Sequence, residues 1–429
     1  MTASAILRAP PEIWEIIHKY YIAIPLFFDS DPAEAYGVDG LVQYYSEVAY
    51  WRSERTRNAL RRVCKSWDVA LDAFRYRYIC LFDVAHGRVP LDALPMAIRL
   101  FVEPDSFCQC KEVCYSERRV FGEARWMSIK KRMAQMLVEA ISTSQTPWKL
   151  EILEGQLQTP DYLLETLATM CPRIQTLTQR SSQDIDKYHQ LVPKTRTLLM
   201  DGDWADGRGI AGGLKLTHLT TLLLYGMMRD FHPEEWSLPS LLHLHLDIWG
   251  LIIDRAAAEL LYRILRCWGR GLRTLSIPCE SSLELPNDIW SLVPRVTDVQ
   301  LPFVWTVVPP IGHPLHVVRL SEILMDLART FSDVEPRLPF QGLIEDGCRS
   351  SIRRIALHEP WRDVLFFSSG IQWDIYTRLG DYCAERGWRL TDRYGSTLDE
   401  YLVRLITSIR APAESHVRKR RNPRRLMSF

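Results

Sequence analysis

Three side chains in the stretch LLHLHLD have the types and spacing that come nearest to a chemical site in this chain. Side chains alternate between the two faces of a β-strand, so His243, His245 and Asp247 would project from one side. Imidazoles and carboxylates are zinc ligands, so a metal site is one interpretation. We favour another, in which these three line an exposed recognition face while Leu244 and Leu246 point into the core.

Cysteines give the second candidate for chemistry. Cys108, Cys110 and Cys114 form C-x-C-x₃-C, a spacing unlike that of zinc sites, and an obvious fourth ligand is missing. The chain also lacks the P-loop, nucleophile-elbow and H-E-x-x-H motifs. We therefore expect reduced thiols, no metal, no cofactor and no catalytic residues, and we predict that the protein is not an enzyme.

Composition describes an ordinary folded protein of 429 residues with 47% hydrophobic residues and a formal net charge of +1. Such a balance creates no global field that attracts nucleic acid or membrane. We expect no signal peptide, because an apolar core followed by a small-residue cleavage site is not seen. The expected compartment is the cytoplasm, the nucleus or both, where the ten cysteines stay reduced.

Two amphipathic segments near the N-terminus must be positioned by each other. Pro10 and Pro11 suit the first turn of a helix, and apolar residues then recur at helical spacing in PPEIWEIIHKYYI. Further along, RTRNALRRVCKSWDVALDAFRYRYI places apolar residues from Leu60 to Tyr78 on one helical face, with Arg57 and other charged residues off it. Two such helices can pack together and still leave apolar surface uncovered.

These segments resemble the F-box motif in its form common in mushroom-type fungal proteins. That form reads L-P-P-E-[IL]-W, then a loop, then L-x-x-V-C-[KR]-x-W, and here Ala9 replaces the first leucine. The resemblance implies a helical module that binds the Skp-type adaptor of a cullin–RING (SCF) ubiquitin ligase. The adaptor-binding residues that it implies are Pro10, Pro11, Glu12, Ile13, Ile16, Ile17, Leu60, Val63, Cys64 and Trp67. The loop, Ala23 to Glu54, is longer than in a compact F-box, and its effect on adaptor docking stays open.

A repeated pattern of apolar residues at i, i+3 and i+5 runs from about residue 148 onward. Its central positions are Leu150, Leu177, Leu198, Leu222, Leu244, Leu275, Val299, Val318 and Ile355. Most spacings fall near the 20–29 residues of a leucine-rich repeat. A proline stands shortly before several copies, as at Pro172, Pro193, Pro239 and Pro294, where it punctuates the approach to a strand.

Helical stretches alternate with these expected strands, for example DYLLETLATMC, DRAAAELLYRILRCW, SEILMDLARTF and QWDIYTRLGDYCAERG, the last followed by a short strand WRLT. The alternation predicts an α/β fold with a parallel sheet. It resembles the leucine-rich-repeat regions attached to F-boxes, which implies an irregular solenoid. An ordinary α/β domain with a parallel sheet is the alternative.

The predicted solenoid would present one polar face to a target protein, since solenoids bind through extended concave surfaces. Alternation along the strands selects its side chains. The target-binding residues that we predict are Tyr225, His243, His245, Asp247, Asp298, Arg319 and Arg354, with Thr221, Leu223, Thr274, Ser276, Gln300 and His358 on the same face. The target itself remains unidentified.

Four segments follow from these observations: an F-box-like module (5–80), a connector and solenoid cap (81–146), the repeats (147–409) and a basic tail (410–429) that resembles a nuclear-import signal or a phosphate-binding arm. The predicted function is the substrate-receptor subunit of an SCF-type ligase. Its partners would be the adaptor, through it a cullin, and a target. A protein-binding scaffold with no ligase role is the main alternative. Two further alternatives are an enzyme, which would need a deep pocket, and a nucleic-acid-binding protein, which would use the basic tail.

Overall fold

The computed structural model describes part of the chain, and predictions that fall in the gaps lie outside the described residues. The described residues are 13–14, 16–17, 22, 24–38, 47–102, 123–155, 161–179, 194–201, 215–226, 231–247, 255–278, 288–301, 309–320, 351–357, 360–367 and 370–407. Outside them lie the cysteine cluster, the helix expected at SEILMDLARTF, His358 and the basic tail.

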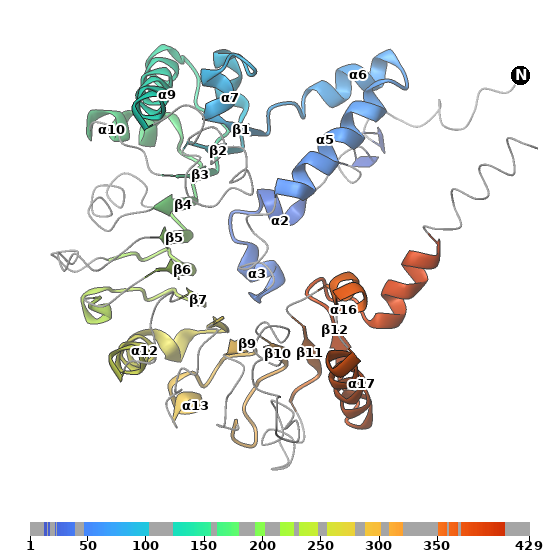
Figure 1. Cartoon of the computed structure of the whole chain (residues 1–429). Coiled ribbons are helices and arrows are strands. Elements are labelled where there is room, and N and C mark those ends of the chain that lie inside the picture. The colour runs from blue at the N-terminus through green and yellow to red at the C-terminus, as the bar shows by residue number, and fades with distance from the viewer. Residues whose placement is uncertain are drawn as a thin grey trace, which may run out of the picture. The chain divides into compact units, whose positions relative to one another are not determined.

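Twelve strands form one sheet whose order follows the chain (Figure 1). They are β1 Tyr78–Cys80, β2 Arg99–Phe101, β3 Ile152–Glu154, β4 Thr176–Gln179, β5 Thr197–Asp201, β6 Thr221–Tyr225, β7 His243–Asp247, β8 Thr274–Ser276, β9 Asp298–Leu301, β10 Val317–Leu320, β11 Arg354–Ala356 and β12 Arg389–Thr391. The sheet is parallel throughout, and parallel neighbours need crossover connections. Several of these connections, where the structure describes them, contain helices. The predicted α/β class with a parallel sheet is confirmed.

The helices occupy the N-terminal segment and the connections between strands. They are α2 Pro25–Phe28, α3 Pro32–Tyr36, α5 Glu47–Arg61, α6 Lys65–Asp72, α7 Leu81–Ala85, α9 Glu123–Thr143, α10 Asp161–Met170, α12 Arg255–Trp268, α13 Ile289–Leu292, α16 Trp361–Phe367 and α17 Gly370–Glu385, with further helical residues at 13–14, 16–17, 22 and 398–407. Among the described helices, none combines the length and the apolarity that a membrane span requires. The chain divides into two compact units, Met1–Thr274 and Leu275–Phe429.

Register in the first unit aligns the leucines that the repeat pattern selects. Leu177 of β4 pairs with Leu198 of β5, which pairs with Leu222 of β6 and then with Leu244 of β7. The first repeat is a correction, because Leu153, and not the predicted Leu150, is the partner of Leu177. The sheet also begins earlier than the repeats counted from the sequence, since β1 and β2 pair with each other and β2 pairs with β3.

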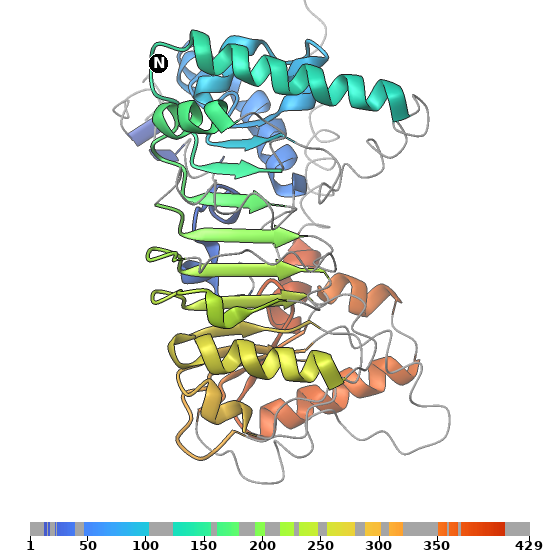
Figure 2. The ribbon, with the colours of Figure 1, turned by 90° about the vertical axis from the view of Figure 1, so that its left-hand side faces the viewer.

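Helices cover one face of the first unit's strands and the N-terminal segment lies on the other. In Figure 1, α9, α10 and α12 are on the outer side of the strands, while α2 and α3 are on the inner side. Figure 2 shows the same strands side by side in chain order, with the covering helices in front. The apolar stripe of α12 is buried in full: Leu260, Leu261, Ile264, Leu265 and Trp268. Burial of such a stripe is what stabilises an amphipathic helix in a protein.

The second unit repeats the same local pattern. Val318 of β10 pairs with Val299 of β9 and with Ile355 of β11, which pairs with Leu390 of β12. The predicted strand WRLT is therefore present. The preceding helix α17 is followed by Gly387 at φ +68°, a left-handed conformation that glycine adopts without a Cβ clash.

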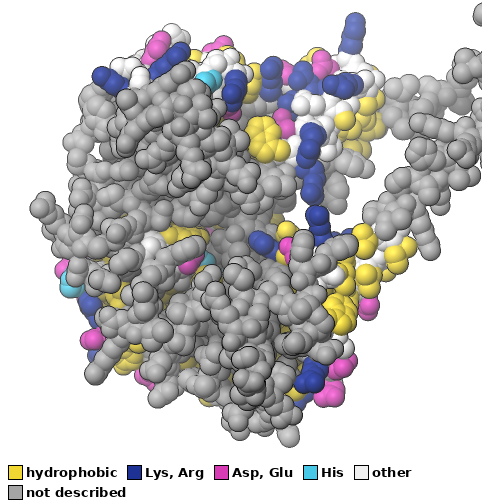
Figure 3. Space-filling model, viewed as in Figure 1, with side chains coloured by type: hydrophobic (Ala, Val, Ile, Leu, Met, Phe, Trp, Pro, Cys, Tyr) yellow, Lys and Arg dark blue, Asp and Glu magenta, His cyan; other side chains and the backbone are white. Residues whose placement is uncertain are grey.

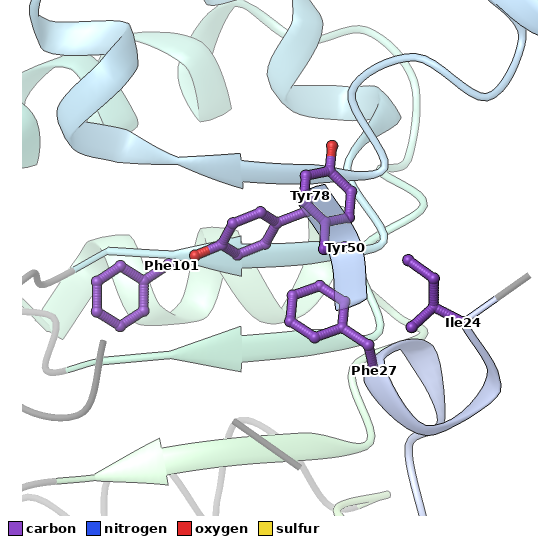
Figure 4. Packing of buried hydrophobic residues seen from close by; sticks show 5 residues of the cluster. All are labelled: Ile24, Phe27, Tyr50, Tyr78 and Phe101. Carbon is purple, nitrogen blue, oxygen red and sulfur yellow. The ribbon is translucent and has the colours of Figure 1, made fainter. Parts of the chain in front are cut away.

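An aromatic cluster joins the N-terminal segment to the sheet (Figure 4). Ile24 and Phe27 from α2 and its N-cap meet Tyr50 of α5, Tyr78 of β1 and Phe101 of β2, and all five are buried. The Phe27 ring stacks on the Tyr50 ring at 5.5 Å between centroids and meets the Tyr78 ring edge-on at 5.2 Å. Aromatic pairs in these geometries contribute about 0.5–1.5 kcal/mol each beyond the area they bury. Residues that precede the sheet in sequence are thus part of its core.

Candidate functional site

The second apolar segment near the N-terminus folds as two helices, which corrects the single helical face predicted for it. Helix α5 ends at Arg61 and α6 begins at Lys65, with Cys64 in extended conformation at φ −162° and ψ 165°. Val63 and Cys64 therefore lie in the connection between helices, and Tyr78 belongs to β1. The chain turns sharply at the centre of the V-C-K-x-W half of the F-box-like motif.

The two halves of the F-box-like motif meet through their tryptophans. The rings of Trp14 and Trp67 lie 5.0 Å apart between centroids, although the residues are far apart in sequence. Within the second half, Arg61 of α5 donates to Asp68 at 2.6 Å and contacts Asp72 at 3.2 Å, both on α6. The contact between the two tilted rings and these ion pairs position the first helix, α5 and α6 relative to one another.

Apolar side chains remain exposed around this contact. The exposed fractions are 46% for Ile13, 62% for Ile16, 60% for Val63 and 76% for Val69. Figure 3 shows hydrophobic side chains gathered over the α5–α6 region, beside several lysine and arginine side chains. Grouped apolar residues on a protein surface are typical of interaction sites. We call Ile13, Ile16, Val63 and Val69 the exposed apolar surface.

The predicted adaptor-binding residues divide into three groups in the structure. Ile13, Ile16, Val63 and Cys64 are exposed, and Ile17, Leu60 and Trp67 are half-buried. Pro10, Pro11 and Glu12 lie outside the described residues. The exposed group is accessible to a partner, and the half-buried group has part of its surface covered within the helices.

A buried polar network lies beneath the same helices, and it corrects the prediction that Arg57 is off the packed face. Arg57 is buried and donates to the Glu54 carboxylate from Nε at 2.9 Å and from Nη2 at 2.7 Å. Arg77 donates to Glu54 and to the carbonyl oxygen of Ile22, which also accepts from Ser53. A buried carboxylate needs such donors, since burial without them is costly. The network fixes the helices to the start of the sheet.

The predicted recognition face of the sheet forms, but in the first unit it is not open. Thr221, Leu223 and Tyr225 of β6 pair with His243, His245 and Asp247 of β7, as strand alternation predicts. His243 and His245 are only 3% exposed and Tyr225 is 9% exposed. We call this side of β4–β8 the inner face. The prediction that His243, His245 and Tyr225 form an exposed surface is wrong, because α3 and the residues before it lie against that face.

Backbone and carboxylate groups of the covering segment bind hydroxyl groups on the inner face. The carbonyl oxygen of Ser30 accepts from Thr176 at 2.8 Å and from Thr197 at 2.7 Å. The carboxylate of Asp31 accepts from Thr221 at 2.7 Å and from Thr220 at 2.6 Å, and Arg196 lies 3.5 Å from it. These donors explain how the Asp31 carboxylate is buried, because hydrogen bonds to charged groups offset desolvation.

His243 connects the covering segment to the next strand. Its Nε2 lies 3.1 Å from the Glu34 carboxylate and its Nδ1 lies 3.0 Å from the Thr274 hydroxyl. A carboxylate only accepts, so Nε2 carries the proton and Nδ1 accepts from Thr274. Burial lowers the pKa of His243, which keeps the imidazole neutral, whereas the hydrogen bond from His243 lowers the pKa of Glu34. With both ring nitrogens engaged in this way, His243 links α3 to β7 and β8.

Arg99 holds the other end of the covering segment. It donates to the Glu154 carboxylate, from Nε at 2.9 Å, and to the carbonyl oxygen of Phe27 at 2.6 Å. Its guanidinium carbon also lies 4.0 Å from the centroid of the Phe27 ring. Arg99 is 1% exposed, so all of these interactions take place away from water. Removal of either partner would leave the other charge buried without a counterion, which strongly destabilises a protein.

The remaining predicted target-binding residues are only partly accessible. In the second unit, Asp298 and Arg319 are buried and form a bidentate ion pair with both N–O distances at 2.9 Å. Arg354 and, in the first unit, Asp247 are half-buried. Among the described residues, groups of three or more potential metal ligands are not found. The seven predicted residues therefore do not form one open surface within either unit.

Two relevant features were missed in the sequence. The stretch GRGIAG, residues 207–212, has the glycine spacing G-x-G-x-x-G and lies outside the described residues. It follows β5 in the chain and precedes the bridge between Lys215 and Ser237. The other is the segment DSDPAE, whose Ser-Asp-Pro turn signal reads as a loop and gives no hint of its contacts.

Acid should destabilise the protein through His245, because burial lowers the pKa of this side chain to about 3. An unfolded histidine has a pKa of about 6.5, so the unfolded chain takes up the proton first as the pH falls, and stability decreases below that pH. Between pH 7.5 and pH 5 the loss from this one group is about 2 kcal/mol. We expect His245→Gln to remove that part of the pH dependence in urea unfolding. His218→Gln, at an exposed histidine, is the control and should keep the full pH dependence.

The fold and the site together define an α/β protein with a parallel sheet and a partly exposed apolar helix cluster at its N-terminal end. Comparison with known proteins adds no closer assignment. No protein-family model matches the chain, and no curated protein matches its sequence.

Proposed function

We propose that this chain is the substrate-receptor subunit of an SCF-type ubiquitin ligase. The observation that supports this most is the exposed apolar surface, Ile13, Ile16, Val63 and Val69, beside the contact between Trp14 and Trp67. Ile13 and Val63 belong to the two halves of the F-box-like motif, and Ile16 and Val69 lie two residues beyond Trp14 and Trp67. An adaptor subunit that covered them would bury apolar side chains that water now solvates, and each would contribute about 1.5–3 kcal/mol if fully buried.

The parallel sheet would be the target-holding part, with strands that follow one another as in a leucine-rich-repeat solenoid. Its twelve strands in chain order agree with such an arrangement. The receptor would act without chemistry of its own. It would raise the effective concentration of a target lysine near a conjugating enzyme bound elsewhere in the assembly. The ion-pair network from Glu54 to Arg77 would transmit the position of the helices to the sheet, because it joins the two.

Co-expression of the full chain with a tagged Skp-type adaptor tests the proposal. We expect the two to elute together as a complex after affinity capture and gel filtration, and a cullin N-terminal domain to join them. A chain that folds, elutes alone and leaves the adaptor without a partner would favour the alternative function, a protein-binding scaffold outside any ligase.

A further inference from the structure

The segment from Phe27 to Glu34 crosses the strands of the first unit in order. The Phe27 carbonyl contacts β2 through Arg99, and the Ser30 carbonyl contacts β4 and β5. Asp31 contacts β6, and Glu34 contacts β7. Contact positions thus advance along the sheet with residue number. Figure 1 shows α2 and α3 on this side of the strands.

Two kinds of contact hold the two ends of this segment. The end at α2 is part of the aromatic core, with Phe27 packed between Tyr50 and Tyr78. The end at α3 is held by polar groups, apart from Ala33, which packs on Leu199, Leu223 and Tyr225. The α2 end is an anchor. The α3 end makes the contacts that any peptide with a similar arrangement of carboxylates could make.

The inner face offers donors suited to acidic groups. A row of hydroxyls at the start of successive strands, Thr176, Thr197 and Thr221, is followed by the Nε2–H of His243. Arg196 and Arg273 stand at its border, where Arg196 lies 3.5 Å from Asp31 and Arg273 lies 3.4 Å from Glu34. The hydroxyls, the His243 imidazole and Arg273 donate to a carbonyl or a carboxylate of the bound segment, and Arg196 forms an ion pair with Asp31. This face also has an apolar contact, where Ala33 packs on Leu199, Leu223 and Tyr225.

We propose that the inner face of β4–β7 is a binding site for an acidic peptide and that Ser30–Glu34 is its intramolecular occupant. The class of ligand is a short segment with two carboxylates three residues apart around a proline and a small residue, as in Ser-Asp-Pro-Ala-Glu. As an account of target choice, this rests on the proposed receptor function. A target with such a segment would displace α3, while α2 stays anchored in the aromatic core.

Exchange is feasible because the outer contacts of α3 are solvated. The side chains of Glu34, Arg196 and Arg273 are each about half exposed, so their ion pairs contribute little, of order 0–1 kcal/mol each. The tether gives the internal segment an effective concentration in the millimolar range. A free peptide therefore competes poorly with the intact chain, and removal of the internal carboxylates should reveal the site.

The test uses the full chain carrying Asp31→Ala and Glu34→Ala, with a fluorescein-labelled peptide DSDPAEAYGV as the probe. In fluorescence anisotropy at low salt, we expect this variant to bind the probe at least tenfold more tightly than the wild-type chain does. A control peptide, NSNPAQAYGV, should bind at least tenfold more weakly. Adding Thr221→Val and His243→Gln to the variant should abolish probe binding. Equal binding of the two peptides, or no binding of the probe by a folded variant, would overturn the proposal.

A second measurement needs no variant and decides the case if the variant fails to fold. Hydrogen exchange of the wild-type chain is followed by mass spectrometry with and without the unlabelled peptide in millimolar excess. If the peptide displaces α3, the backbone amides of residues 32–37 should exchange faster, while the exchange rates of the α2 amides stay the same. Unaltered exchange at 32–37 at saturating peptide would contradict it. Neither experiment involves the adaptor, so a failure here is distinct from a failure of the ligase role.

Discussion

Replacing Arg99 with alanine should lower the free energy of unfolding of the protein by about 3–5 kcal/mol. The change leaves the Glu154 carboxylate and the Phe27 carbonyl oxygen buried without the donor that now serves both. It also removes the cation that lies over the Phe27 ring, so the anchor of the N-terminal segment weakens. The urea midpoint, followed by tryptophan fluorescence, should fall by roughly 1 M or more.

Two further variants distinguish the stability cost of breaking the buried Arg99–Glu154 pair from the cost of removing any arginine. Arg88→Ala removes an exposed arginine whose ion pair with Asp83 is at 3.1 Å, and it should change stability by less than about 1 kcal/mol. Arg99→Met combined with Glu154→Leu replaces both charges by apolar groups and should recover most of the loss. If the urea midpoints of the Arg99→Ala and Arg88→Ala proteins were equal, the contacts of Arg99 with Phe27 and Glu154 would not be what holds the N-terminal segment.

Aspartates at two positions of the exposed apolar surface should abolish adaptor binding. Ile13→Asp with Val63→Asp introduces one charge in each half of the F-box-like motif, at side chains that are 46% and 60% exposed. In a complex both carboxylates would lose water without gaining a partner, which is costly. Interface anchors of this kind cost about 2 kcal/mol or more each when altered, so the dissociation constant should rise at least 100-fold.

The matched control places the same charges on apolar side chains elsewhere. Ile311 is 91% exposed and Val403 is 63% exposed, and neither belongs to the F-box-like motif. Ile311→Asp with Val403→Asp should bind the adaptor as the wild-type chain does in calorimetric titration. Thermal unfolding of both double variants checks that each is folded. Equal affinities for the two double variants would rule out the exposed apolar surface as the adaptor site.

Strand positions could be read from the sequence because parallel strands here have one strongly apolar central residue. Leu177, Leu198, Leu222 and Leu244 were placed in register by the spacing alone. The first repeat failed for a physical reason. In WKLEILE, both Leu150 and Leu153 are buried, so hydrophobicity does not distinguish a residue on the approach to the strand from the one in its centre.

Local periodicity could not reveal the break between α5 and α6 or the cover on the inner face. The break at Cys64 has no glycine or proline to signal it, and the apolar spacing continues through it from Leu60 to Trp67. The cover depends on contacts between residues about 150–210 positions apart, such as Ser30 with Thr176 and Glu34 with His243. Single-sequence patterns carry information about neighbours along an element, and pairings across the chain lie beyond that reach.

Hydrogen exchange of the full chain, alone and in the presence of excess Skp-type adaptor, tests the central claim most directly. Binding at the exposed apolar surface predicts slower exchange in the helical residues 13–14 and 16–17, at the end of α5 and through α6, because a covering subunit suppresses local opening there. Strands β9–β12 should exchange at the same rate in both samples. Unchanged exchange across residues 13–72 with the adaptor in excess would contradict the claim that this surface receives it.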